Sequence, residues 1–280
     1  MSSPMGAFLR PDGYAGPRGL QALSREGSTV FEAVRLVRRR VAERSEQRHL
    51  PYAGQPSPHA VEPVLLVPGF LAGDSSLTAM SLWLRRKGWR TYRSGIHVNV
   101  GCTQEVADRL ERRVEAIALR RGRSVTLVGH SLGGMLARGL ATRRPDLVAG
   151  IVTMGSPVLA PAAVHPVLAW DAGMLTRLSR AGFGGFMSQD CVAGTCALRS
   201  FEETNQPLDP AVGYTAVYSR RDGVVDWKAC LDPAALQVEV RTSHCGMAFD
   251  PVVFDVVLEA LQGQLLSRAS RLAARSEVAG

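Results

Sequence analysis

The chain has 280 residues, which suffices for one large α/β domain with an insertion but leaves little room for a second domain. Hydrophobic residues make up 46% of it, so a sizeable core is available. The net charge of +8 comes from 33 basic and 25 acidic residues, and only Lys87 and Lys228 are lysines. No zinc-finger spacing or RNA-binding signature accompanies the arginines, so we expect no nucleic-acid partner.

Residues 1–60 are expected to form an extension to the main domain. Met1–Leu20 mixes Pro, Gly and Arg without a continuous apolar core, so we expect no secretory signal. No stretch approaches the roughly 18 uninterrupted apolar residues of a membrane span. These observations favour a cytoplasmic protein, with peripheral membrane contact left open. Residues 1–23 are predicted to be disordered, and residues 50–59, with three prolines, to be a linker.

Between these two segments, a basic amphipathic helix is predicted over Thr29–Gln47. Its apolar face repeats at three- and four-residue steps through Val30, Val34, Val37 and Val41. The remaining surface carries Arg38, Arg39, Arg40 and Arg44. Such a helix either lies on an anionic membrane or packs on the main domain with its arginines in water. We favour packing, because β-branched valines make a weak membrane face.

Residues 61–268 are predicted to form the main domain, in which strands and helices alternate. The expected strands are 64–67, 89–96, 125–128, 149–154, 213–218 and 237–240. The first expected helix is capped by Asp74 or Ser75. Further helices are expected over 103–121 and 132–143, and a closing helix starts at Pro251. Strict alternation predicts a doubly wound, mostly parallel sheet. The polar tail, 269–280, is expected to fray.

The alternation fails between residues 158 and 210. This stretch is too long for a connection and too apolar for a free loop, so we predict a helical cap or lid with a flexible joint at Gly182–Gly185. An ordinary helical excursion that completes the core is the alternative. As a lid, it would supply the substrate-binding residues Trp170, Met174, Phe183 and Phe186.

The strongest motif is Gly129-His130-Ser131-Leu132-Gly133, placed between a strand-like and a helix-like segment. This is the pattern of a nucleophile elbow, which exposes the serine hydroxyl on a strained turn. Side chains at Gly129 or Gly133 would collide with the neighbouring strand or helix. The context makes a chance occurrence of the pattern unlikely, and Ser131 is therefore predicted to be the nucleophile.

A serine nucleophile needs a base and an acid, which in this architecture follow it in the chain. Only His244 lies beyond the last strands, and His130 is expected to point away from the site. The acid is predicted to be Asp222, directly after a strand, with Asp226 as the alternative.

Two backbone amides should stabilise the oxyanion formed on the substrate. One is expected from Leu132, which begins the helix after the serine. The other should come from Phe70 or Leu71, in the loop after the first strand. In that loop Gly69 allows the backbone to approach the acyl group.

The five cysteines show no metal-binding spacing, and we expect neither a metal nor a cofactor. Cytosolic thiols are normally reduced. Two disulfides are left open by the sequence: Cys191–Cys196, which would close a small loop, and Cys230–Cys245.

Together these motifs resemble the α/β-hydrolase superfamily over residues 63–266, and most of all its lipase and esterase branch. The resemblance rests on Val67-Pro68-Gly69-Phe70, the serine motif through Gly134, Met154-Gly155-Ser156-Pro157, Asp222-Gly223 and Ser243-His244. It differs in having Pro68-Gly69 where that branch more often has His-Gly. The resemblance implies hydrolysis of an ester through a Ser131 acyl-enzyme, without a cofactor, and the apolar lid suggests a lipid-like or other apolar acyl ester.

Two other functions compete with ester hydrolysis. An acyltransferase would use the same residues with an alcohol or amine acceptor, and the sequence does not separate the two. A non-catalytic membrane-bound or partner-binding module would be expected to lack part of the triad, whereas Ser131, Asp222 and His244 are all present in order. Dehalogenases and epoxide hydrolases are disfavoured because they need a carboxylate at the elbow. Nothing in the sequence indicates an oligomeric state.

Overall fold

The computed structural model describes residues 5–47 and 62–278, so the predicted linker at 50–59 lies outside the described residues. Its centre is a sheet of six strands, all paired in parallel, as the alternating pattern predicted. In spatial order the strands are β2 (Arg90–Arg93), β1 (Pro63–Val67), β3 (Val125–His130), β4 (Val148–Met154), β5 (Gly213–Tyr218) and β6 (Leu236–Glu239). The chain reverses its direction of winding between β1 and β3, and ligands of such sheets bind outside the carboxyl ends of the strands at this switch point.

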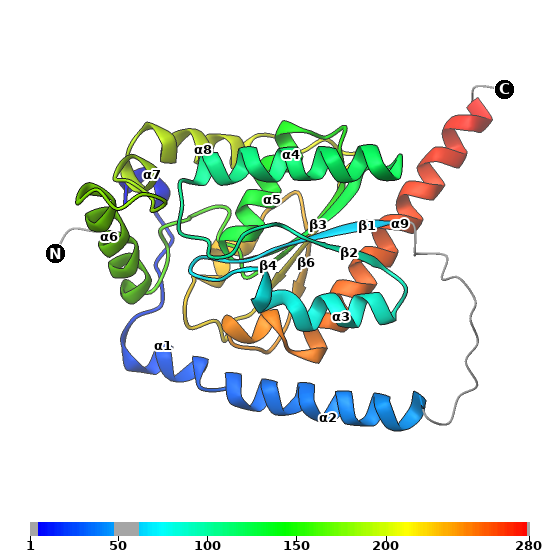
Figure 1. The fold of residues 1–280 in the computed structure, drawn as a ribbon, viewed down its shortest axis with the longest axis horizontal. Helices are drawn as coiled ribbons and strands as arrows, with labels where there is room; N and C mark the ends of the chain where they lie inside the picture. Colours follow the sequence, from blue (N-terminus) through cyan, green and yellow to red (C-terminus); the bar gives the residue numbers. More distant parts are fainter. Residues whose placement is uncertain (1–4, 48–61, 279–280) are drawn as a thin grey trace.

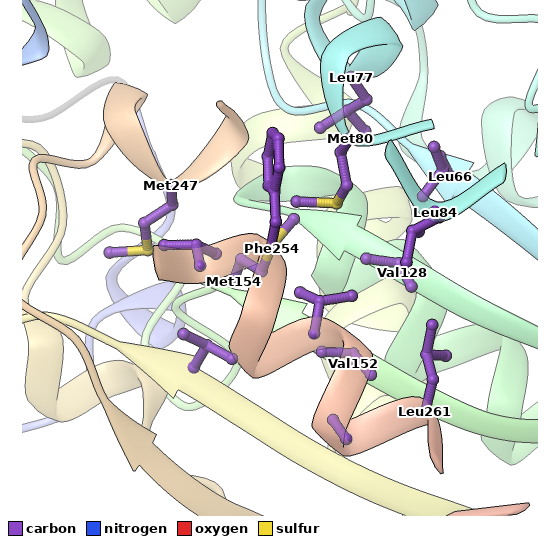
Figure 2. Close-up of a cluster of buried hydrophobic side chains, with 14 of the residues drawn as sticks. Leu66, Leu77, Met80, Leu84, Val128, Val152, Met154, Met247, Phe254 and Leu261 are labelled. Carbon is purple, nitrogen blue, oxygen red and sulfur yellow. The ribbon is translucent and has the colours of Figure 1, made fainter. Parts of the chain in front are cut away.

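Helices cover both faces of the sheet, which explains why every residue of β1 is buried (Figure 1). On one face lie α4 (Thr103–Arg121) and α5 (Leu132–Arg143), which pack with Leu65 and Val67 of β1. On the other face α3 (Thr78–Arg86) and α9 (Pro251–Val278) pack with Val64 and Leu66. Figure 2 shows this second core, where the fully buried Phe254 of α9 lies among Met80, Met154 and Met247.

The first helical segment departs from the prediction at its start. Residues Asp74–Leu77 form the 3-10 helix η2, whose cap is Gly73. The Asp74 carboxylate accepts hydrogen bonds from the amides of Ser94 and Gly95 instead of capping the helix. The strand that precedes these residues, β2, is shorter than the predicted strand 89–96.

The closing helix α9 is longer than expected. It continues to Val278, so the prediction of a frayed tail at 269–280 is wrong for the described residues 269–278. These residues are rich in Ala, Leu, Arg and Glu, which are strong helix formers even without a buried face. Arg271 also donates to the carbonyl of Ala211, at 3.0 Å.

The segment between β4 and β5, where a cap is predicted and which is called the cap below, contains α6 (Pro166–Arg180), α7 (Asp190–Ala193) and α8 (Thr195–Asn205). The amino-terminal segment contacts it through η1 (Ala7–Leu9) and its neighbours: the Gly6 amide donates to Val192 O at 2.9 Å, and Leu9 O accepts from the Ala162 amide at 2.8 Å. The prediction of disorder for residues 1–23 is therefore wrong for the described residues 5–23. The sequence did not predict this order, because backbone hydrogen bonds to a distant segment leave no periodicity in the sequence.

The extension continues as α1 (Gly19–Glu26) and α2 (Thr29–Gln47), which run along the outside of the domain below α3 (Figure 1). The bounds of α2 match the prediction. The helix packs on the domain as favoured, but not with its arginines in water. Arg35 and Arg39 instead pair with Asp250 and Asp255 of the domain. The valine face is left in water, with exposures of 66% at Val30, 43% at Val34, 59% at Val37 and 62% at Val41. Among the described helices, none is long and apolar enough to cross a membrane.

Candidate active site

Ser131 forms the turn between β3 and α5. Its backbone has φ 52° and ψ −122°, a conformation that costs a non-glycine residue of order 1–3 kcal/mol. The Ser131 amide is held by Met154 O at 2.8 Å. A Cβ on Gly129 would lie 2.4 Å from Gly133 O, and one on Gly133 would lie 2.2 Å from Val67 O. The predicted steric need for both glycines is confirmed.

Asp222 and His244 meet beyond the carboxyl ends of β5 and β6. Asp222 Oδ2 lies 2.7 Å from His244 Nδ1, and Oδ1 accepts the amides of Val224 and Val225, both at 2.8 Å. Both residues are buried, with exposures of 3% and 5%. An ionised carboxylate can only accept, so the contact places a proton on Nδ1 and leaves Nε2 of the neutral ring to act as a base.

The alternative acid, Asp226, has a different environment. Its Oδ1 accepts the Lys228 amide at 3.1 Å and caps the 3-10 helix η3 (Trp227–Cys230). Its Oδ2 accepts the Ala15 amide at 3.0 Å. Asp226 therefore organises the loop and the amino-terminal segment, whereas Asp222 contacts the imidazole.

The electrostatic environment makes His244 a stronger base than an ordinary histidine. Burial by itself lowers the pKa of His244, but the charge and hydrogen bond of Asp222, with a further contribution from the Glu26 charge, outweigh it and raise the pKa above the ordinary value. The neighbouring His130 behaves in the opposite way. Burial, with a smaller contribution from His244, lowers the pKa of His130 to about 3, so this ring is neutral.

His130 lies against His244, so the expectation that its side chain is directed away from the site is wrong. The rings of His130 and His244 are 4.9 Å apart between centroids, and His130 Nε2 lies 3.0 Å from the His244 carbonyl oxygen. This carbonyl can only accept, so the proton of neutral His130 is on Nε2. The Ser131 hydroxyl has no hydrogen-bond partner within the described chain. Catalytic contacts are often long without substrate and tighten when it binds.

The two amides predicted for the second oxyanion donor are not equivalent. The Leu71 amide donates to Asn99 O at 3.1 Å and is thus already engaged. The Phe70 amide lies one residue closer to Gly69, where an added Cβ would be 3.1 Å from Ser131 Cβ. Leu132 is the first residue of α5, and the amides of a helix's first turn have no partner within the helix. Phe70 and Leu132 are therefore the pair available to an oxyanion.

Two glutamates of the amino-terminal extension hold the loop that carries His244. Glu26 Oε1 accepts the amides of Gly223 and His244, at 3.0 and 2.9 Å, and its Oε2 accepts the Cys245 amide at 3.0 Å. Glu32, only 1% exposed, accepts the amide and hydroxyl of Ser243. Glu26 thus joins the Asp222 loop to the His244 loop. Sequence reasoning missed both residues, because an isolated glutamate on a helix carries no sign of its partner some 200 residues away.

A cavity of about 130 Å³ with a mainly apolar lining opens beside Ser131. It lies between α5, the cap and the amino-terminal segment. Its apolar lining includes Met5, Leu9, Met135, Leu168, Ala172 and Met187. The contributions of Met5 and Leu9 were not anticipated, since they come from a segment predicted to be disordered.

None of the four predicted substrate-binding residues lines this cavity. Trp170 and Phe183 are each 60% exposed, and Met174 and Phe186 are half-buried elsewhere in the cap. The reason is the rotation of α6, which turns Leu168 and Ala172, four residues apart, towards the cavity. Trp170, midway between them in sequence, lies on the opposite side of the helix. The structure therefore places these four side chains outside the cavity beside Ser131.

Comparison with known proteins supports the same architecture. Residues 62–183, from β1 into the cap, match the family model described as alpha/beta hydrolase fold. Among solved structures, the mature form of a Bacillus licheniformis lipase is similar to 75% of this chain and 96% of its own, with 16% identity and a TM-score of 0.58.

Two further structures have similar values. A thermophilic esterase from Thermogutta terrifontis covers 72% of this chain and 90% of its own, with 18% identity and a TM-score of 0.51. A monoacylglycerol lipase from Paleococcus ferrophilus is similar over 71% of this chain and 94% of its own, with 15% identity and a TM-score of 0.50. At such identities the likeness is one of fold. The family match over residues 62–183, the strand order and the serine elbow together identify the fold of this chain as that of the α/β hydrolases.

Proposed function

We propose that this protein is a serine hydrolase of carboxylic esters with an apolar acyl group. Two observations carry the proposal: the 2.7 Å contact between Asp222 and His244, and the strained elbow that holds Ser131. The names of the solved structures with this fold, two lipases and an esterase, support ester chemistry.

In the proposed reaction each of these groups has one role. Neutral His244 takes the proton of the Ser131 hydroxyl as its oxygen attacks the acyl carbonyl carbon. The amides of Leu132 and Phe70 stabilise the negative charge on the carbonyl oxygen. His244 then gives the proton to the leaving alkoxide, and the ester bond breaks to leave an acyl group on Ser131. Water, deprotonated by His244, releases the acid and restores the serine.

The cavity suggests the size of the acyl group. Its volume of about 130 Å³ is below the roughly 300–1,000 Å³ of typical ligand pockets. An acyl chain that enters it must be apolar and short, unless the cap and amino-terminal segment move apart. A series of p-nitrophenyl esters from acetate to palmitate tests this point: a maximum at a short or intermediate chain supports the apolar pocket, whereas equal rates for all chains would contradict it.

Labelling with a fluorophosphonate tests the nucleophile without assuming a substrate. The wild-type protein should label once per chain, with the modified peptide containing Ser131. Ser131→Ala should not label, and Ser270→Ala, at an exposed serine of α9, should label normally. An unlabelled, folded wild type would refute the proposal. Product analysis with added alcohol then separates hydrolysis from acyl transfer, because a new ester would show that an alcohol, and not water, takes the acyl group.

We also propose that the valine face of α2 contacts a lipid surface. Val30, Val34, Val37 and Val41 are exposed, and the exposed Arg38 borders them, a combination that fits an anionic membrane. The wild type should co-sediment with vesicles containing phosphatidylserine, and Val37→Asp should reduce this binding. Equal binding by both proteins would contradict the assignment.

A further inference from the structure

Three cysteines that are distant in sequence converge at the junction of the cap and the core. Cys102 is the residue that precedes α4, Cys191 lies in α7 and Cys196 lies in α8. Their three sulfur atoms lie within 4.8 Å of one another, and Cys102 Sγ and Cys196 Sγ are 3.4 Å apart. All three are free thiols of intermediate exposure. We propose that they form a binding site for one thiophilic metal ion, such as Zn²⁺ or Cu(I).

The geometry suits a metal better than a sulfur–sulfur bond. Zinc–thiolate bonds of about 2.3 Å place ligand sulfurs about 3.8 Å apart in a tetrahedral site. This separation lies between the 3.4 Å from Cys102 Sγ to Cys196 Sγ and the 4.8 Å within which all three sulfurs lie. A disulfide requires about 2.05 Å and would leave the third thiol unused. Soft thiolate ligands select Zn²⁺ and Cu(I) over Mg²⁺ or Ca²⁺. A tetrahedral ion would take a water or hydroxyl as its fourth ligand, and the Ser188 hydroxyl lies 3.4 Å from Cys191 Sγ.

Two opposing effects act on the charge of these sulfurs. Cys102 and Cys196 lie at the amino-terminal ends of α4 and α8, where the helix dipole is positive. Burial raises the pKa of Cys102 above its ordinary value and that of Cys196 to about 12, while hydrogen bonds from the backbone of Glu105 and Gln104 act in the opposite direction.

A metal at this position would fix the cap to the core. It would join α7 and α8 to the start of α4 beside the cavity, of which Cys191 is a lining residue. The site is structural, and it does not depend on the proposed hydrolase activity.

Cobalt titration of the reduced, chelator-treated full-length protein tests the site. One equivalent of Co²⁺ should give thiolate-to-cobalt charge-transfer absorption and the visible bands of a tetrahedral ion, and Zn²⁺ should displace it. Cys191→Ser and Cys196→Ser should each weaken binding about 100-fold or more, because even loss of a group that supports a ligand costs 10–100-fold. Cys245→Ser, at an exposed thiol outside the cluster, should bind as the wild type does.

Thermal unfolding provides a second measurement in case a variant is poorly folded. Zn²⁺ should raise the melting temperature of the wild type and of Cys245→Ser, but not that of Cys196→Ser. The proposal is overturned by a wild type that binds no Co²⁺, by equal binding in Cys196→Ser, or by mass spectrometry that finds two of the three thiols joined as a disulfide.

Discussion

Replacing Glu26 tests whether the amino-terminal extension positions His244, the proposed base. Glu26→Ala removes a carboxylate that accepts the amides of Gly223, His244 and Cys245 at 2.9–3.0 Å. Hydrogen bonds to a charged group contribute about 1.5–3 kcal/mol each. Glu26 is only half-buried, so water replaces part of this interaction, and we expect unfolding to become easier by about 2–4 kcal/mol.

The effect on chemistry follows from the position of the imidazole. Small displacements of a catalytic group cost up to about 100-fold in rate, so fluorophosphonate should react with Ser131 about 10- to 100-fold more slowly in Glu26→Ala. Removal of the Glu26 charge should also lower the pKa of His244, because this charge is one of the causes that raise it. The pH at which the labelling rate reaches half its maximum should move down.

A second substitution separates charge from geometry. Glu26→Gln keeps an oxygen that can accept from His244 and Gly223 but removes the charge. It should show the lower pH midpoint with a rate near that of the wild type. The control is Glu115→Ala, at an exposed glutamate of α4. If Glu26→Ala labels at the same rate and with the same pH profile as Glu115→Ala, the positioning role is refuted.

Substitutions at three other positions test the site and the residues that support it. Asp222→Asn should reduce ester turnover by roughly 10⁴-fold and move the pH midpoint down, because the charge that contributes most to raising the pKa of His244 is then lost while burial still lowers it; an unchanged pH profile would contradict this. Asp232→Ala leaves the buried guanidinium of Arg138 without the 2.9 Å partner of its Nε, and urea unfolding should show a loss of about 3–5 kcal/mol, more than any exposed ion pair would cost. Leu168→Trp should shift the preferred ester towards shorter acyl chains and Leu168→Ala towards longer ones; no shift in either would show that the chain does not enter this cavity.

The sequence by itself determined the parallel sheet and the place of the serine. Both depend on short-range patterns: apolar segments buried on two faces, helical periodicity, and glycines at positions where the Ser131 turn admits no side chain. The bounds of α4 and α5 match the predicted helices 103–121 and 132–143 for the same reason. The chain order of Ser131, Asp222 and His244 was likewise readable from sequence.

Only the tertiary structure decided which residues surround the site. The inward face of α6 depends on how the cap is rotated, so Leu168 and Ala172 replace Trp170 and Met174 in the cavity. The contacts of Glu26 bridge about 200 residues, and Cys102 is 94 residues from Cys196. Such pairings are set by the packing of whole elements, and no local pattern in the chain encodes them.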